Sequence, residues 1–174
     1  MKSFAGSYMI SKTLTEKKLL EFASDHALDL VTLIPPFIVG PFICPKLPSS
    51  VRISLATAFG EWDQHDALLN LSMVHIDDVA RAHIYLFEYP NANGRYICSF
   101  KTFTIGEICR AVTTKYSEFP TPSIKIRENF KGFKPPRGPG LSSKKLLESG
   151  FEFKYGIDEM FDGAIQCCKE KCCL

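Results

Sequence analysis

Apolar residues recur at helical spacing near the start of the chain and predict a long helix over residues 8–25. We expect one stripe of this helix to face a packed surface; the stripe comprises Tyr8, Lys12, Thr15, Leu19, Phe22 and Ala23. Glu16 lies off that stripe, and Ile10 and Leu14 form a second apolar strip on the far side. Two apolar strips predict that the helix packs against a sheet and also against another element or subunit.

A short apolar run over residues 28–34 follows and ends at Pro35 and Pro36. The run does not alternate with polar residues, which is the pattern of a strand buried on both faces. A helix, a short link and such a strand predict an α/β unit with a parallel sheet. Ligands in open α/β sheets bind outside the carboxyl ends of the strands, so we expect residues 35–41 to face a cofactor.

The rest of the chain predicts further short strands and amphipathic helices. We expect helices over residues 49–59, from 77, from 105, over 143–150 and over 157–168, and strands over 71–76, 95–99 and 124–126. A predicted loop over residues 60–70 holds the only tryptophan, Trp62. Thr104 and Glu107 have the spacing of a capping box, and Ser142 or Ser143 is expected to cap the helix that ends at Gly150.

Asp77 and Asp78 stand together at the start of a predicted helix. Paired carboxylates can act as acid and base, but Asp at a helix start also satisfies free backbone amides, and we favour this capping role. His83 falls on the apolar stripe of the same helix, so we expect it to be packed rather than to bind a ligand. His75 lies in the preceding strand, where the sequence indicates no partner for it.

The composition is that of a soluble globular domain, with 45% hydrophobic and 23% charged residues in a chain of 174. A chain of this length can bury a sizeable core in one domain. The net charge of +2 and the lack of a basic stripe argue against nucleic acid as a partner. Neither a signal-peptide run nor a membrane-spanning apolar stretch is found, so we expect a cytoplasmic protein without membrane association.

The seven cysteines are expected to be reduced thiols, because their number is odd and several lie within apolar periodic segments. The adjacent pairs Cys167-Cys168 and Cys172-Cys173 do not have the spacing of a zinc site, and no histidine follows His83. We therefore expect no metal in this protein.

Tyr8 and Lys12 are four residues apart, so a helix places a phenol and an ammonium on one face, about one turn apart. A phenol has an ordinary pKa of about 10, and a nearby positive charge favours its ionised form. Such a tyrosine can give a proton to a carbonyl oxygen while a hydride reaches the carbonyl carbon. Both side chains also commonly cover apolar surface on helices, and this alternative stays open.

Four motifs in order carry a family resemblance. They are Tyr8-x3-Lys12, Ile34-Pro-Pro-Phe-Ile-Val-Gly-Pro41, Val74-His-Ile-Asp-Asp-Val-Ala-Arg-Ala-His83 and Gly94-Arg-Tyr-Ile-Cys-Ser99. The chain resembles the second half of an extended short-chain dehydrogenase/reductase of the plant dihydroflavonol reductase group. The resemblance implies the C-terminal part of a Rossmann-type, doubly wound parallel sheet with a small substrate-binding subdomain. Within one partial domain, residues 8–41 would end the dinucleotide-binding sheet, and residues 42–72 and 116–174 would lie mainly on the substrate side.

The same resemblance implies NADPH-dependent reduction of a carbonyl on a flavonoid or isoflavonoid-like substrate. Tyr8 would donate the proton, and Lys12 would favour its phenolate and hold the nicotinamide ribose. The cofactor's nicotinamide side would be lined by Pro35, Pro36, Phe37 and Ile38. Ser50 would contact the cofactor from a helix start, although from the residues alone we favour a helix N-cap at Ser49 or Ser50 over phosphate binding there.

The sequence departs from the family at its start. The 11 glycines form no G-x-G-x-x-G or G-x-x-G-x-x-G turn for the pyrophosphate. The family's Ser or Thr partner of the tyrosine and the first five strands of its sheet are expected upstream of Tyr8. We therefore expect either part of a longer protein or a chain that works beside another polypeptide. The alternative function is a catalytically silent chain that associates with intact relatives through helix 8–25.

Overall fold

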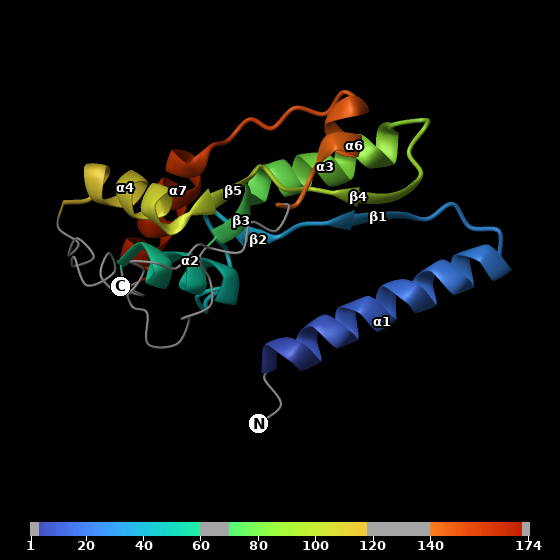
Figure 1. The fold of residues 1–174 in the computed structure, drawn as a ribbon, viewed down its shortest axis with the longest axis horizontal. Coiled ribbons are helices and arrows are strands. Elements are labelled where there is room, and N and C mark those ends of the chain that lie inside the picture. Colours follow the sequence, from blue (N-terminus) through green and yellow to red (C-terminus); the bar gives the residue numbers. More distant parts are fainter. Residues whose placement is uncertain (1–3, 60–69, 118–139, 172–174) are drawn as a thin grey trace, which may run out of the picture.

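A computed structural model describes residues 4–59, 70–117 and 140–171 (Figure 1). The helices are α1 (Phe4–Asp25), α2 (Ser49–Phe59), α3 (Ile76–Glu88), α4 (Ile105–Lys115), α6 (Lys144–Glu148) and α7 (Ile157–Glu170). The strands are β1 (Val31–Ile34), β2 (Phe37–Val39), β3 (Asn70–His75), β4 (Gly94–Ile97) and β5 (Lys101–Thr104). The predicted strand over 124–126, and the predicted loop with Trp62 except for its last residue, lie outside the described residues.

The described strands form two small sheets, and the strands of one are interleaved in sequence with those of the other. In the first, β1 pairs in parallel with β4, with Ile34 opposite Ile97. In the second, β3 lies between β2, its parallel neighbour, and β5, which runs antiparallel to it. The predicted α/β fold with parallel strands is confirmed, whereas the short strands β2 and β5 were not predicted.

The prediction that the strand ending at Ile34 is buried on both faces is wrong. All four residues of β1 are only half-buried. Among the described strands, β4 alone pairs with β1, and α1 runs along one side of this pair (Figure 1). The apolar run is typical of a strand that is covered on both faces, whereas the described residues bury β1 only in part.

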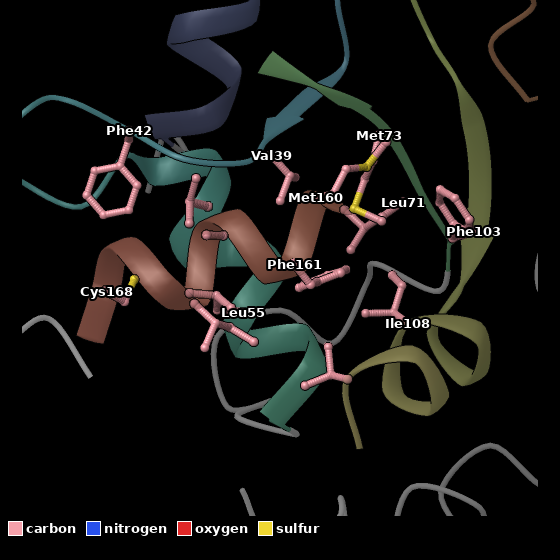
Figure 2. Packing of buried hydrophobic residues seen from close by; sticks show 14 residues of the cluster. Val39, Phe42, Leu55, Leu71, Met73, Phe103, Ile108, Met160, Phe161 and Cys168 are labelled. Carbon is pink, nitrogen blue, oxygen red and sulfur yellow. The ribbon is translucent and has the colours of Figure 1, made fainter. Parts of the chain in front are cut away.

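The larger core lies where α2, α4 and α7 pack against the second sheet (Figure 2). Met160 and Phe161 of α7 point between Leu71 and Met73 of β3 and Leu55 of α2. Full burial of side chains of this size stabilises the fold by about 1.5–3 kcal/mol each. The predicted final amphipathic helix is thus confirmed, with its apolar stripe in this core.

A second core lies between α3, the first sheet and α6. Its buried members are Val74, Val79, Ala82, Leu86, Tyr96, Cys98, Leu146 and Phe151. His83 was predicted to be packed on this face, and that is wrong, because its side chain is exposed. Its Nδ1 lies 2.8 Å from the Val79 carbonyl oxygen one turn earlier, so the ring turns back along its own helix.

The start of α3 corrects the capping role predicted for Asp77 and Asp78. The N-cap is His75, whose Nδ1 accepts a hydrogen bond from the Asp77 backbone N–H at 3.1 Å. Asp78 is fully buried and instead accepts hydrogen bonds from the backbone N–H groups of Lys154 and Tyr155. The His75 ring stacks on Tyr155 at 4.3 Å between centroids, so both residues join α3 to the segment before α7.

The ends of the next helices follow the predictions in part. Thr104 and Glu107 form the predicted capping box of α4. Gly150 follows α6 with φ of 103°, a left-handed conformation that suits glycine. Ser143 precedes α6 without capping it, since its Oγ accepts from the Ser99 N–H and donates to the Ser99 carbonyl, both at 2.7 Å.

Candidate active site at the carboxyl end of β1

Glu16 ties α1 to the first sheet. Its Oε1 accepts hydrogen bonds from Thr32 Oγ1 of β1 at 3.1 Å and from Arg95 Nε of β4 at 2.7 Å. A second nitrogen of the same guanidinium, Arg95 Nη2, donates to Oε2 at 2.6 Å, which completes a forked ion pair. The Arg95 hydrogen bonds lower the pKa of Glu16 against the raising effect of its burial, and they raise the pKa of Arg95. Glu16 is therefore a carboxylate at neutral pH.

This contact sets Tyr8 and Lys12 level with the end of β1. The helix α1 and the strand β1 run in opposite directions (Figure 1). From Glu16, Lys12 lies about 6 Å back along the helix, and from Thr32, Ile34 lies about 6.6 Å on along the strand. Tyr8 lies about 12 Å back, and Pro36 about 13 Å on. The tyrosine, the lysine and the Pro35-Pro36 link thus lie at the same height along the axis of the unit.

Tyr8 and Lys12 are both exposed, with 57% of Tyr8 accessible. The Lys12 Nζ lies 5.6 Å from the centroid of the Tyr8 ring, within the range of a cation–π contact. Within the described residues, no carboxylate forms an ion pair with Lys12. The ammonium is therefore beside the phenol and open to a ligand.

The predicted packed stripe of α1 is wrong in its orientation. Leu19 and Phe22 are 48% and 52% exposed, whereas Ala23 is buried and Glu16 half-buried. Glu16 and Ala23 lie seven residues apart, nearly two full turns, so both face the sheet. On this inner face Glu16 forms an ion pair with Arg95, which lies 79 positions away in the chain, and the apolar periodicity of the helix gives no sign of such a contact.

The remaining predicted residues follow β1 along the chain. Pro35 and Pro36 connect β1 with β2, and Phe37 and Ile38 are the first two residues of β2; all four are half-buried. Ser50 is half-buried in the first turn of α2, which packs against β2, and its carbonyl accepts from Ser54 Oγ at 2.9 Å. The chain thus joins Pro35–Ile38 to the end of β1 and brings Ser50 to the neighbouring sheet.

Glu16, Thr32 and Arg95 are the residues at this site that the sequence prediction missed. The signal for Glu16 was its position four residues after Lys12, which continues the Tyr8-Lys12 spacing along one helix face. Thr32 and Arg95 give no such local signal, because their roles follow from strand pairing. In the register of β1 and β4, Thr32 lies directly opposite Arg95.

The open character of the site distinguishes it from two hollows elsewhere. One, of about 590 Å³, is lined mainly by α4 and includes Lys101, Arg110 and Lys115. The other, of about 480 Å³, lies between β1 and α3. Neither is lined by Tyr8 or Lys12. In the described ranges there is no group of three or more His, Cys, Asp or Glu that could hold a metal ion, and no helix there is long and apolar enough to cross a bilayer.

Residues 5–106 match the NAD dependent epimerase/dehydratase family, which is more than half of the chain. The chain belongs to this family. Vestitone reductase from Medicago sativa is 48% identical over 171 residues, which cover 98% of this chain and 51% of that protein. Dihydroflavonol 4-reductase from Callistephus chinensis is 41% identical over 172 residues, covering 98% of this chain and 46% of that protein.

The crystal structure of vestitone reductase from alfalfa matches with a TM-score of 0.87 at 47% identity, covering 99% of this chain and 55% of that one. The chain thus spans about half the length of the curated relatives it matches. The predicted resemblance to the dihydroflavonol reductase group is confirmed, and the α/β architecture is part of a Rossmann-type fold. The family description implies a nicotinamide dinucleotide cofactor.

Proposed function

We propose that the protein reduces a carbonyl on a flavonoid or isoflavonoid-like substrate with NADPH. The observation that carries this proposal is the exposed Tyr8–Lys12 pair level with the end of β1, in a chain whose relatives include vestitone reductase and dihydroflavonol 4-reductase. The donor set fits the nicotinamide end of a dinucleotide. An ammonium offers three N–H donors to ribose hydroxyls, and no described carboxylate competes for those of Lys12.

In this mechanism, the Tyr8 hydroxyl donates its proton to the substrate carbonyl oxygen. Lys12 stabilises the phenolate that remains, because its ammonium lies 5.6 Å from the ring centroid and brings positive charge to it. NADPH, when bound, supplies the hydride. Pro35, Pro36, Phe37 and Ile38 form an apolar wall that orients the nicotinamide and keeps water away, and the two prolines have no N–H to satisfy. Ser50 would add a hydroxyl contact from the start of α2.

The proposal divides the chain by role. Residues 8–41 hold the catalytic pair and the cofactor wall, and residues 42–72 and 116–174 form mainly the substrate side. The composition supports the cytoplasm as the location, which a fluorescent fusion expressed in plant cells would test.

The test joins the N-terminal half of Medicago sativa vestitone reductase ahead of Met1 and measures NADPH oxidation with a flavonoid-type ketone. Tyr8→Phe should cut turnover by about 100-fold to 10,000-fold, the usual range of general-acid catalysis. Lys12→Ala should lower turnover and also weaken NADPH binding, since one ammonium serves the phenol and the ribose. Tyr89→Phe and Lys17→Ala, which change the same residue types away from the pair, should leave turnover within about 2-fold.

Full turnover of the Tyr8→Phe chimera would remove Tyr8 as the acid. The 174-residue chain tested alone should neither oxidise NADPH nor bind it tightly, because its sequence has no Gly-rich turn for the pyrophosphate. Rapid NADPH oxidation by that chain would contradict this expectation.

The second candidate function is association of a catalytically silent chain with intact relatives through α1. The observation in its favour is the apolar strip of Ile10 and Leu14, which are 62% and 56% exposed. Ile10→Glu with Leu14→Glu should then shift a mixture with vestitone reductase toward separate chains in light scattering, whereas Ser11→Glu with Thr15→Glu should not. Equal scattering masses for both double variants would refute the association. NADPH oxidation by the chimera that Tyr8→Phe lowers by about 100-fold or more would favour the enzymatic function over this one.

A further inference from the structure

We infer that Glu16 and Arg95 form a positioning pair, which holds α1 at the height and rotation that place Tyr8 and Lys12 beside the end of β1. This inference rests on the proposed function, because it assigns a role toward the Tyr8–Lys12 chemistry. Neither residue touches the reacting atoms in this account. Both act through the helix that carries the pair.

The geometry of the contact is specific in two directions. The guanidinium binds both carboxylate oxygens at 2.7 and 2.6 Å, and Thr32 supplies a third hydrogen bond at 3.1 Å. Since the three donors come from two adjacent strands, the carboxylate can neither slide along the sheet nor tilt away without losing one of them. The Glu16 side chain is 16% exposed and the Arg95 side chain 59% exposed, so solvent reaches the ion pair from the arginine side and partly screens it.

The helix periodicity connects Glu16 to the catalytic pair. Four residues advance a helix by about 40° beyond one full turn, so Tyr8, Lys12 and Glu16 lie within about 80° of one another on the surface of α1. A rotation of α1 by 20° would move atoms at the outer radius of the helix by about 2 Å. A misplacement of about 1 Å can cost on the order of 100-fold in rate, so the rotation must be fixed.

Apolar packing does not fix that rotation by itself in the described structure. The large apolar side chains of α1 are largely exposed: Tyr8, Met9, Ile10, Leu14, Leu19, Leu20 and Phe22. Ala23 is the buried apolar side chain near the far end of the helix, about four turns from Tyr8 at about 3.6 residues per turn. The directional bonds of Glu16 therefore carry the orientation of the helix.

The test uses the chimera described above. Glu16→Gln should lower kcat by about 10-fold to 100-fold while the KM for the ketone changes less than about 3-fold, because the substrate side is untouched. Arg95→Lys should recover only part of the activity that Arg95→Gln loses, since a lysine keeps the charge but cannot form the fork. The exchange Glu16→Arg with Arg95→Glu should recover part of the loss of either single variant. Glu21→Gln removes an exposed ion pair with Lys18 on the same helix and is the matched control.

A double-mutant cycle separates positioning from general destabilisation. In the Tyr8→Phe background, Glu16→Gln should change turnover by less than about 3-fold, because the acid that it positions is already gone. The inference would be overturned if the fold-losses in turnover of Glu16→Gln and Tyr8→Phe simply multiplied in the double variant. It would also be overturned if Tyr8→Phe disabled the chimera while Glu16→Gln left its kcat normal. If Tyr8→Phe itself has no effect, the proposed function fails instead. Hydrogen exchange of the 174-residue chain then tests by itself whether Glu16 holds α1 in place. There Glu16→Gln should speed exchange of α1 amides at least about 10-fold over Glu21→Gln, and equal rates would overturn the inference.

Discussion

Replacing Asp78 with asparagine should destabilise the protein far more than the same change at its neighbour Asp77. The Asp78 carboxylate is fully buried and accepts from the Lys154 N–H at 3.0 and 3.2 Å, from the Tyr155 N–H at 3.1 Å and from Arg81 at 2.6 Å. Both oxygens face N–H donors. An amide in either orientation would therefore turn its own NH2 group toward a donor and leave that donor without an acceptor.

The size of the effect follows from these contacts. A hydrogen bond to a charged group contributes about 1.5–3 kcal/mol, and breaking a buried ion pair costs about 3–5 kcal/mol. Arg81 is 31% exposed and can turn to water, which places the expected loss near the lower end. We expect Asp78→Asn to lower the free energy of unfolding by about 3 kcal/mol. Arg81→Gln should cost less, because the backbone donors still hold the carboxylate.

Urea denaturation followed by circular dichroism measures this difference. Asp77→Asn is the control, because that side chain is 55% exposed and its change should cost less than about 0.5 kcal/mol. If Asp78→Asn lowers the free energy of unfolding by less than about 1 kcal/mol, the hydrogen bonds between Asp78 of α3 and residues 154–155 do not stabilise the fold as expected. An equal loss at Asp77 would restore the capping role that the sequence predicted.

Two further predictions concern single side chains. Hydrogen bonds from Thr104 and Lys101 lower the pKa of Glu107 from 4.5 to about 2, so its stabilising contribution is complete above about pH 4.5 and is lost as the pH falls toward 2. Glu107→Gln should thus lower the free energy of unfolding by about 0.5–1 kcal/mol at pH 7, the lower part of the range for caps because the group is partly solvated. In urea titrations the loss should become progressively smaller at acid pH. A loss that stays constant with pH would contradict the capping box. Burial raises the pKa of Cys98 to about 12, so iodoacetamide at pH 8 should label exposed Cys44 while sparing Cys98 in peptide mass spectra, and equal labelling would contradict its burial.

The sequence predicted those parts of the fold whose cause is local. Residues 157–168 repeat their apolar side chains at helical spacing, and α7 buries that stripe. Thr104 and Glu107 need only each other to form their capping box. The positions of Tyr8 and Lys12 on one helix also follow from local spacing, and the motifs identified the family from half the length of its members.

The parts that could not be predicted depend on partners distant in the chain. Asp78 looked like a cap because its bonds to Lys154 and Tyr155 span more than seventy residues. Helix periodicity assigned the inner face of α1 to Leu19, while the contact with Arg95 turned Glu16 inward. In both cases a charged side chain with a remote partner overrode the apolar pattern.

The link between the two sheets has a mechanical consequence. The chain crosses from one sheet to the other at Pro35-Pro36, through α3, and over residues 98–100. The first and last of these crossings are neighbours, because the Cys98 N–H donates to the Ile34 carbonyl at 3.0 Å. These two crossings mark a line between the two sheets. The Phe100 N–H donates to the Met73 carbonyl at 3.0 Å, and the Ser143 Oγ hydrogen-bonds to both the N–H and the carbonyl of Ser99. Bending the molecule along this line would strain these few hydrogen bonds, at about 1 kcal/mol each, and leave both strand ladders whole. It would also disturb the second core, which contains Val74 of β3 and Tyr96 of β4.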